Sequence, residues 1–282
     1  MHKHVFVGGL HRSGTSLFAE ILGRHADISS LSGTGVFMEE GQHVQDVYPS
    51  DEVYGGPGRF GLDDEAHLTE DWSTDPLADG VRLREAWAPY WDLSRSFLVE
   101  KSPPNLIRSR FLQAAFPGAY FIFLVRHPVV SSLAVQKWSM TSLFSLVTHW
   151  IKCHELMRSD AAFLERALLL PYEHLVQAPS AALRDVARFL GVDDLDRVPV
   201  DDVRPSANDR YESAWTTRYA EADRTHEPDF VPAKKLMRMR KEATKLEQGV
   251  GHPVEVSFSK REGADLIAHF GDVVESMGYS LV

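Results

Sequence analysis

The sequence predicts an α/β protein in which a parallel sheet forms the middle of three layers, with helices on both faces. Short runs in which every residue is apolar are typical of strands buried on both sides. A polar or proline-bearing turn and then a helical pattern follow each run, which is the order of βαβ units. The 282 residues suffice for one large domain, and we expect a core over about 1–190 and a helical and loop cap with a C-terminal element over 192–282.

The elements can be assigned in chain order. Residues 17–22 carry apolar side chains at helical spacing, and an apolar stripe predicts an amphipathic helix over 143–157. Ser180 is the expected N-cap of a further helix that ends at Gly191. The four expected strands are Val5–Val7, Phe97–Val99, Tyr120–Val125 and Ala167–Leu170.

Two long segments, 48–80 and 192–235, interrupt this alternation, and segments of such length often cover an active site. In the second, Tyr211, Trp215 and Tyr219 recur every four residues. This spacing favours a packing stripe on a helix, and the alternative is a wall of an acceptor pocket.

Composition excludes several classes of protein. The net charge of −10 argues against broad binding to nucleic acid or anionic membranes, and no apolar run is long enough for a membrane span. The single cysteine, Cys153, forms no internal disulfide and is expected in the core. With no signal peptide at the N-terminus, we expect a cytoplasmic protein. His149 and His154 are spaced unsuitably for a two-histidine site, and no metal is predicted.

The sharpest motif is the glycine-rich turn at residues 9–16, which follows the first strand and opens a helix. It matches G-x-x-x-x-G-K-[ST] except that Thr15 stands in place of the lysine. Backbone amides and the helix N-terminus can still hold a phosphate. A cation stands three positions earlier, at Arg12, which suits a nucleotide with a short 5′ end whose terminal group is transferred.

This loop resembles that of the PAPS-dependent sulfotransferases of bacterial type, whose 5′-phosphosulfate loop reads [KR]-S-G-[TS]-[TS]. PAPS is 3′-phosphoadenosine 5′-phosphosulfate. The resemblance implies a P-loop-like fold, PAPS as sulfuryl donor, 3′,5′-ADP as product and no metal. The residues that match this loop are Arg12, Ser13, Gly14, Thr15 and Ser16.

Later segments are similar to other motifs of that family. By resemblance Arg126, in the segment 121–128, binds the 3′-phosphate, and Tyr172, in a Y-E-x-L block followed by F-L-G at 189–191, lies near the adenine. Lys101, in Glu100-Lys101-Ser102-Pro103, is similar to a lysine of the tyrosylprotein-type branch that lies near the transferred sulfuryl group.

Two motifs of the family are incomplete. The usual serine eight residues after Arg126 is Ala134, and Ser131, Ser132 and Lys137 are the alternatives for the missing donor. The stretch 260–263 is the nearest match to a C-terminal Arg-Lys-Gly loop.

Sulfuryl transfer needs a base for the acceptor's proton and cations for the leaving phosphate. Arg12 and Lys101 are the expected cations. Glu40 is the first candidate for the base, followed by Glu39 and His43. A glutamate base would need a pKa raised by partial burial.

The sequence thus predicts a sulfotransferase that moves a sulfuryl group from PAPS to a hydroxyl or amine of a glycan or small metabolite. The alternatives are a P-loop kinase of small molecules, in which Glu100 would stand where a Mg²⁺-binding acid is needed, and a catalytically inactive nucleotide-binding module.

Overall fold

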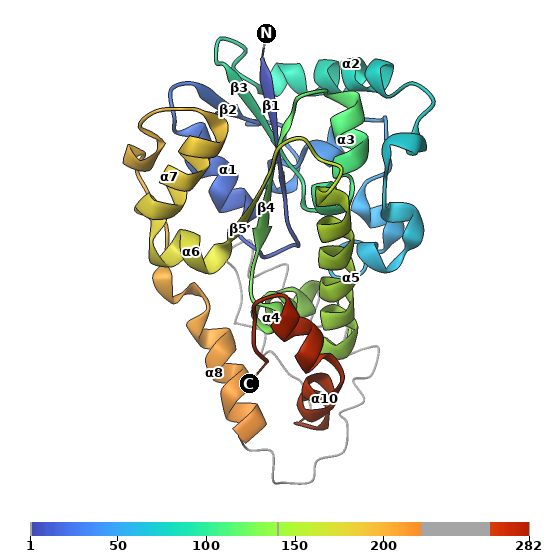
Figure 1. Ribbon diagram of the computed structural model, residues 1–282, viewed down its shortest axis with the longest axis vertical. Coiled ribbons are helices and arrows are strands. Elements are labelled where there is room, and N and C mark those ends of the chain that lie inside the picture. Colours follow the sequence, from blue (N-terminus) through green and yellow to red (C-terminus); the bar gives the residue numbers. More distant parts are fainter. Residues whose placement is uncertain (1, 140, 221–259, 282) are drawn as a thin grey trace.

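The computed structural model describes residues 2–139, 141–220 and 260–281, and within them it has the predicted parallel sheet with helices on both faces (Figure 1). The strands lie in the order β2-β3-β1-β4-β5, and all neighbours are parallel. They are β1 (Lys3–Gly8), β2 (Ile28–Ser30), β3 (Phe97–Lys101), β4 (Tyr120–Val125) and β5 (Ala167–Pro171). The helices are α1 (Thr15–Gly23), α2 (Pro76–Trp87), α3 (Ser109–Ala115), α4 (Pro128–Ser139), α5 (Leu143–Ala161), α6 (Tyr172–Gln177), α7 (Pro179–Leu190), α8 (Asp209–Ala220) and α10 (Lys260–Ser276).

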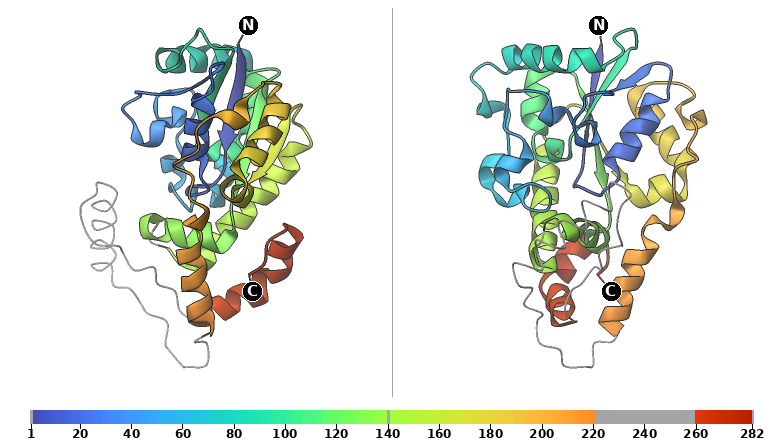
Figure 2. Two further views of the ribbon diagram at one scale, coloured as in Figure 1. Left: turned by 90° about the vertical axis from the view of Figure 1, so that its left-hand side faces the viewer. Right: turned by 180° about the vertical axis from the view of Figure 1, so that it is seen from behind.

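Alternate side chains of β1, β3 and β4 enter separate cores on the two faces of the sheet. In β1, Val5 and Val7 pack with α1, α6 and α7, whereas Phe6 packs with α2, α3 and α5. The view from behind shows the sheet between these two groups of helices (Figure 2, right). Burial on both faces explains why the runs 5–7, 97–99 and 120–125 are apolar at every position.

The four predicted strands are confirmed with small changes at their ends, and the sheet has one strand more. β2 was not predicted because Ile28 is its only apolar residue. The predicted N-cap at Ser180 is wrong, because α7 begins at Pro179 after Ala178. Gly191 ends that helix in the left-handed conformation, as predicted.

The two long segments differ in structure. Short 3₁₀ turns fill most of the stretch between Asp51 and Trp72, and α2 follows. In the second, Tyr211 and Trp215 lie buried on α8, which confirms the packing stripe, and Tyr219 lies outside the described side chains. Cys153 is fully buried in the core, as predicted.

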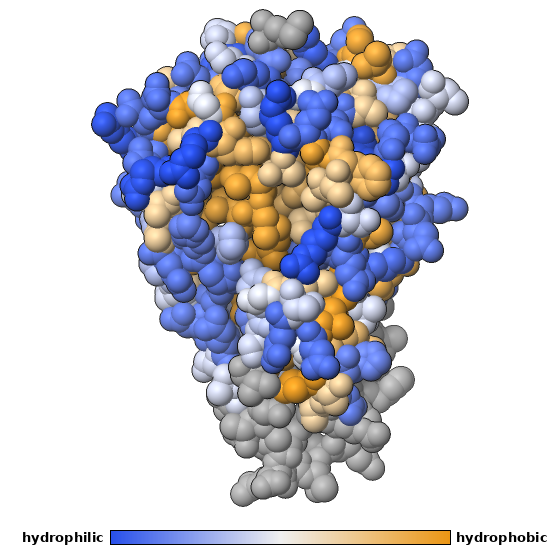
Figure 3. Space-filling view, in the orientation of Figure 1, coloured by the Kyte–Doolittle hydropathy of each residue, from blue (hydrophilic) through white to orange (hydrophobic). Residues whose placement is uncertain are grey.

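β5 is an edge strand with an apolar surface. Its Leu169 is exposed, and the apolar area in the middle of the face in Figure 3 lies over β4 and β5. Among the described helices, none combines the length and the apolar character that crossing a bilayer requires.

Candidate active site

The phosphate loop joins the end of β1 to the start of α1, at the carboxyl edge of the central strand. Arg12 and Gly14 adopt left-handed conformations, with φ of 69° and 95°, which turn the chain sharply before Thr15. At Gly14 any Cβ would lie 2.5 Å from the ring of Tyr172. This position therefore requires glycine for both its conformation and its close packing.

Three polar atoms of the loop are buried and lack a hydrogen-bond partner among the described residues. They are His11 Nδ1, Arg12 Nε and Ser13 Oγ. The guanidinium of Arg12 lies over Trp138, with Cζ 4.8 Å from the ring centroid. Buried polar groups without partners destabilise a protein, so these atoms fit a loop that is completed by a bound anion.

A cavity of about 210 Å³ lies against this loop and brings together most of the predicted site residues. Ser13 and Lys101 are not on its wall, although Lys101 contacts Glu40. The predicted residues that line it are Arg12, Gly14, Thr15, Ser16, Glu40, Arg126 and Tyr172.

Glu40 and Lys101 form a buried ion pair at the edge of this cavity. Lys101 Nζ lies 3.3 Å from Glu40 Oε1 and donates a hydrogen bond of 2.7 Å to the carbonyl of Met38. The other carboxylate oxygen accepts a hydrogen bond of 2.7 Å from Gln42 and lies 3.6 Å from His43 Nε2. Lys101 therefore fixes one oxygen of the candidate base.

The expectation of a raised pKa for a glutamate base is wrong for Glu40. Burial of the carboxyl group opposes its ionisation, but the hydrogen bond with His43 and the charge of Lys101 outweigh burial and lower the pKa of Glu40 to about 2. Burial also lowers the pKa of Lys101, against the effect of Glu40. Glu40 is thus an ionised carboxylate throughout the neutral range.

The loop that carries Glu40 is held by the end of β3. Glu100 is fully buried and accepts hydrogen bonds from the amide of Gly41, at 3.1 Å, and from Asn105 Nδ2, at 2.6 Å. Ser102 Oγ donates to it at 2.6 Å. Because both its oxygens are occupied inside the protein, Glu100 does not offer the metal-binding acid that a kinase would need.

The two other candidates for the base lie differently. Glu39 Oε2 accepts hydrogen bonds of 2.6 Å and 2.8 Å from the hydroxyl and amide of Thr34, and these bonds outweigh burial and lower the pKa of Glu39. His43 contacts Glu40, whose hydrogen bond raises the pKa of His43. Neither lines the cavity at the phosphate loop.

Arg126 belongs to a network that sequence reasoning missed. Its guanidinium donates two hydrogen bonds to Asn208 Oδ1, at 2.7 and 2.9 Å, and one of 2.6 Å to the carbonyl of Arg12. It also lies over Tyr172, with Cζ 4.3 Å from the ring centroid. Asn208 in turn donates to Glu173 at 3.1 Å. The network ties the phosphate loop to the segment just before α8.

The two serines that could replace the missing one do not join Arg126 in the cavity. Ala134 is buried in the core, and Ser131 Oγ donates to the carbonyl of His127 at 3.0 Å. Ser132 lines a different, very small cavity with Ser131. Lys137 and most of the stretch 260–263 lie outside the described side chains.

Within the described residues, no group of three histidine, cysteine or acidic side chains is arranged to hold a metal ion. His149 and His154 are both buried, and burial lowers the pKa of each.

The parallel sheet and the loop at the carboxyl edge of its central strand define an α/β protein with a P-loop-like fold. The model of the sulfotransferase family matches residues 4–197. The chain belongs to this family.

Curated relatives of this chain are protein-tyrosine sulfotransferases. Protein-tyrosine sulfotransferase 2 of Gallus gallus is 26% identical over 200 residues, which make up 67% of this chain and 51% of that protein. The protein-tyrosine sulfotransferase of Drosophila melanogaster is 25% identical over 197 residues, covering 67% of this chain and 38% of that one. The chain thus spans about half the length of these relatives or less.

Solved structures with similarity to the chain are also sulfotransferases. Sulfotransferase STF1 from Mycobacterium tuberculosis has a TM-score of 0.48 and 17% identity over 70% of each chain. The sulfotransferase domain of the Synechococcus PCC 7002 olefin synthase has the same TM-score and identity, and the match covers 90% of this chain and 96% of that domain.

Proposed function

We propose that the protein transfers a sulfuryl group from PAPS to a hydroxyl or amine of a glycan or small metabolite. Membership of the sulfotransferase family supports this reaction. The observation that carries the proposal is the cavity in which the phosphate loop meets the Glu40–Lys101 ion pair and the Arg126–Tyr172 stack.

The loop would hold the 5′-phosphosulfate of the donor. Arg12 Nε and Ser13 Oγ, which are buried without partners, would gain an anion to bind, and the start of α1 adds its partial positive charge. Arg126 and Tyr172 would bind the 3′-phosphate and the adenine.

Transfer then requires an in-line displacement at sulfur. The acceptor oxygen or nitrogen forms a bond to sulfur, and the bond from sulfur to the bridging phosphate oxygen breaks, leaving its electron pair on 3′,5′-ADP. Arg12 and Lys101 would stabilise the charge on that oxygen. Glu40 would take the acceptor's proton, which becomes strongly acidic as the new bond forms, so that a carboxylate of low pKa can accept it.

Calorimetric titration with 3′,5′-ADP, 5′-ADP and Mg·ATP tests the donor site without knowledge of the acceptor. We expect 3′,5′-ADP to bind most tightly. Arg12→Ala should weaken its binding on the order of 10-fold or more, because a charge-assisted contact is lost. Arg188→Ala is the matched control, because Arg188 is an exposed residue of α7.

Preference for Mg·ATP would favour a kinase, and no detectable binding of any of the three ligands would favour an inactive module. Binding of 3′,5′-ADP that is unchanged in Arg12→Ala would refute the assignment of the loop.

A further inference from the structure

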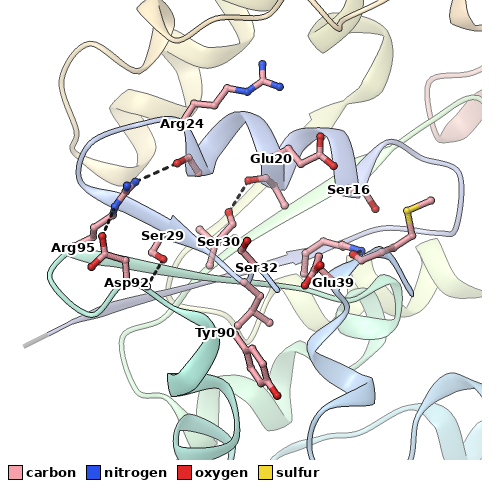
Figure 4. Close-up of a pocket in the computed structure, with 16 residues that line it drawn as sticks. Ser16, Glu20, Arg24, Ser29, Ser30, Ser32, Glu39, Tyr90, Asp92 and Arg95 are labelled. Atoms are coloured by element: carbon pink, nitrogen blue, oxygen red, sulfur yellow. Dashed lines mark hydrogen bonds and ion pairs between the residues drawn. The ribbon is translucent and has the colours of Figure 1, made fainter. Parts of the chain in front are cut away.

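A second and larger cavity, of about 630 Å³, lies on the outer side of α1 (Figure 4). Ser16 and Glu20 of α1, and Arg24 directly after its end, follow one another at intervals of four residues along one wall. Serines of β2 and of the chain just after it, together with Tyr90, form the opposite wall. The volume falls within the range of roughly 300–1,000 Å³ that is usual for sites of drug-sized ligands.

This cavity adjoins the cavity at the phosphate loop. Ser16 and Met38 line both of them. Lys101 lines the larger cavity and Glu40 the smaller, and 3.3 Å separates Lys101 Nζ from Glu40 Oε1. A molecule in the larger cavity would therefore reach the reacting end of a donor that is held by the loop.

Five of the residues that line the larger cavity carry hydroxyl groups. Ser30 Oγ donates to the carbonyl of Ala19, and Ser29 Oγ accepts from the amide of Asp92. The hydroxyls of three other lining residues make no hydrogen bond to another part of the described chain, and they are those of Ser16, Ser32 and Tyr90. These three can bind the hydroxyls of a ligand.

The basic side chains of this cavity are already neutralised. Arg24 forms a bidentate pair with Asp202, at 2.7 and 2.8 Å. Arg95 pairs with Asp92 at 3.1 Å and donates to backbone carbonyls at the end of α1 and in β2.

Of the three acidic side chains that line the cavity, Asp92 pairs with Arg95, whereas Glu20 and Glu39 form no ion pair with a described residue. Glu20 is exposed, and no ion pair or hydrogen bond joins its carboxylate to another described residue. The carboxylate of Glu39 accepts its hydrogen bonds from Thr34, and the charge of Lys101 acts on it without a direct ion pair. The uncompensated charge on the wall is therefore negative, which attracts a cation and repels an anion.

We propose that the larger cavity binds the sulfuryl acceptor and that this acceptor is a cationic, hydroxyl-rich molecule of the amino-sugar class. Glu20 and Glu39 hold its ammonium groups, and Ser16, Ser32 and Tyr90 bind its hydroxyls. One of those hydroxyls faces Glu40 and the donor. The inference rests on the proposed function and names its substrate class.

Three trisaccharides of similar size test the charge preference. They are a glucosamine trimer (cationic), an N-acetylglucosamine trimer (neutral) and a galacturonic acid trimer (anionic). Transfer from radiolabelled PAPS is measured at slightly acidic pH, where the amines are protonated. The glucosamine trimer should have the highest kcat/KM and the galacturonic acid trimer the lowest.

Substitutions at Glu20 distinguish weaker binding of the acceptor from a general loss of activity. Glu20→Gln should raise KM for the glucosamine trimer about fivefold, as expected for an exposed ion pair, and leave kcat nearly unchanged. Glu20→Lys should raise the KM for the glucosamine trimer further and improve transfer to the galacturonic acid trimer. Glu85→Gln, an exposed acid of α2 on the other face of the sheet, should change nothing.

A variant that fills the cavity tests the location of the acceptor without changing any charge. Ser32→Trp should abolish transfer to the glucosamine trimer while 3′,5′-ADP binds as in the unmodified protein. If the unmodified protein does not bind 3′,5′-ADP, the proposed function itself is contradicted. If it binds 3′,5′-ADP normally but prefers the anionic trimer, the inference alone is overturned. The same holds if it transfers to a tyrosine peptide with a KM that Glu20→Gln and Ser32→Trp leave unchanged.

Discussion

The ion pair at the candidate active site should make the stability of the protein depend on pH through Glu40. The pKa of this carboxyl group falls from 4.5 to about 2 on folding, so its ionised form stabilises the folded state by about 3 kcal/mol at neutral pH. Because the pKa is lowered, this contribution is fully present above pH 4.5 and is lost as the pH falls through 2. Glu40→Gln keeps the size of the side chain and removes the charge.

Urea unfolding, followed by tryptophan fluorescence at pH 7 and pH 3, measures this effect. Glu40→Gln should be less stable at pH 7 by up to about 3 kcal/mol, and the difference should fall to less than about half at pH 3. Glu155→Gln, at an exposed position of α5, is the control and should show a difference near zero at both values. An equal loss at both pH values would refute the charge as the cause, and a variant more stable at pH 7 would refute the pairing itself.

Three further substitutions probe the same site. Gly14→Ala should destabilise the fold by about 1–3 kcal/mol and weaken 3′,5′-ADP binding, because its Cβ would meet Tyr172 at 2.5 Å; thermal unfolding and calorimetry check this. Lys101→Met leaves the carboxylate of Glu40 buried without its cation and should cost about 3–5 kcal/mol, and adding Glu40→Gln should restore part of the loss in a double-mutant cycle. Arg126→Ala should weaken 3′,5′-ADP more than 5′-AMP in calorimetry, and equal losses would contradict a contact with the 3′-phosphate.

The sequence predicted those parts of the fold that repeat a simple pattern. β1, β3 and β4 are buried on both faces, so their apolar runs stand out. β2 is a strand of three residues with two serines, and it pairs only with β3. Its stability comes from a neighbour that is distant in the sequence, so no local signal marks it.

The candidate site likewise has parts that the sequence predicted and parts that it did not. Consecutive residues carry the phosphate loop, so its motif was visible. Asn208, the partner of Arg126, lies in a polar stretch with no periodicity. The position of Glu100 after a strand indicated a possible metal ligand. Its hydrogen bond with the amide of Gly41 depends on how the chain returns over β3, which no local pattern shows. The low pKa of Glu40 likewise depends on neighbours that folding brings together.

The central position of β1 has a consequence for biosynthesis. During translation this strand is made before both strands that pair with it, because its register partners begin at Phe97 in β3 and Tyr120 in β4. At about 5–20 residues per second, the ribosome needs on the order of ten seconds to supply them. Over that interval the apolar segment Val5–Val7 stays without its neighbours, so the nascent chain offers chaperones an early binding segment. The yield of folded protein should therefore depend on chaperone supply and on translation speed over the codons between β1 and β4.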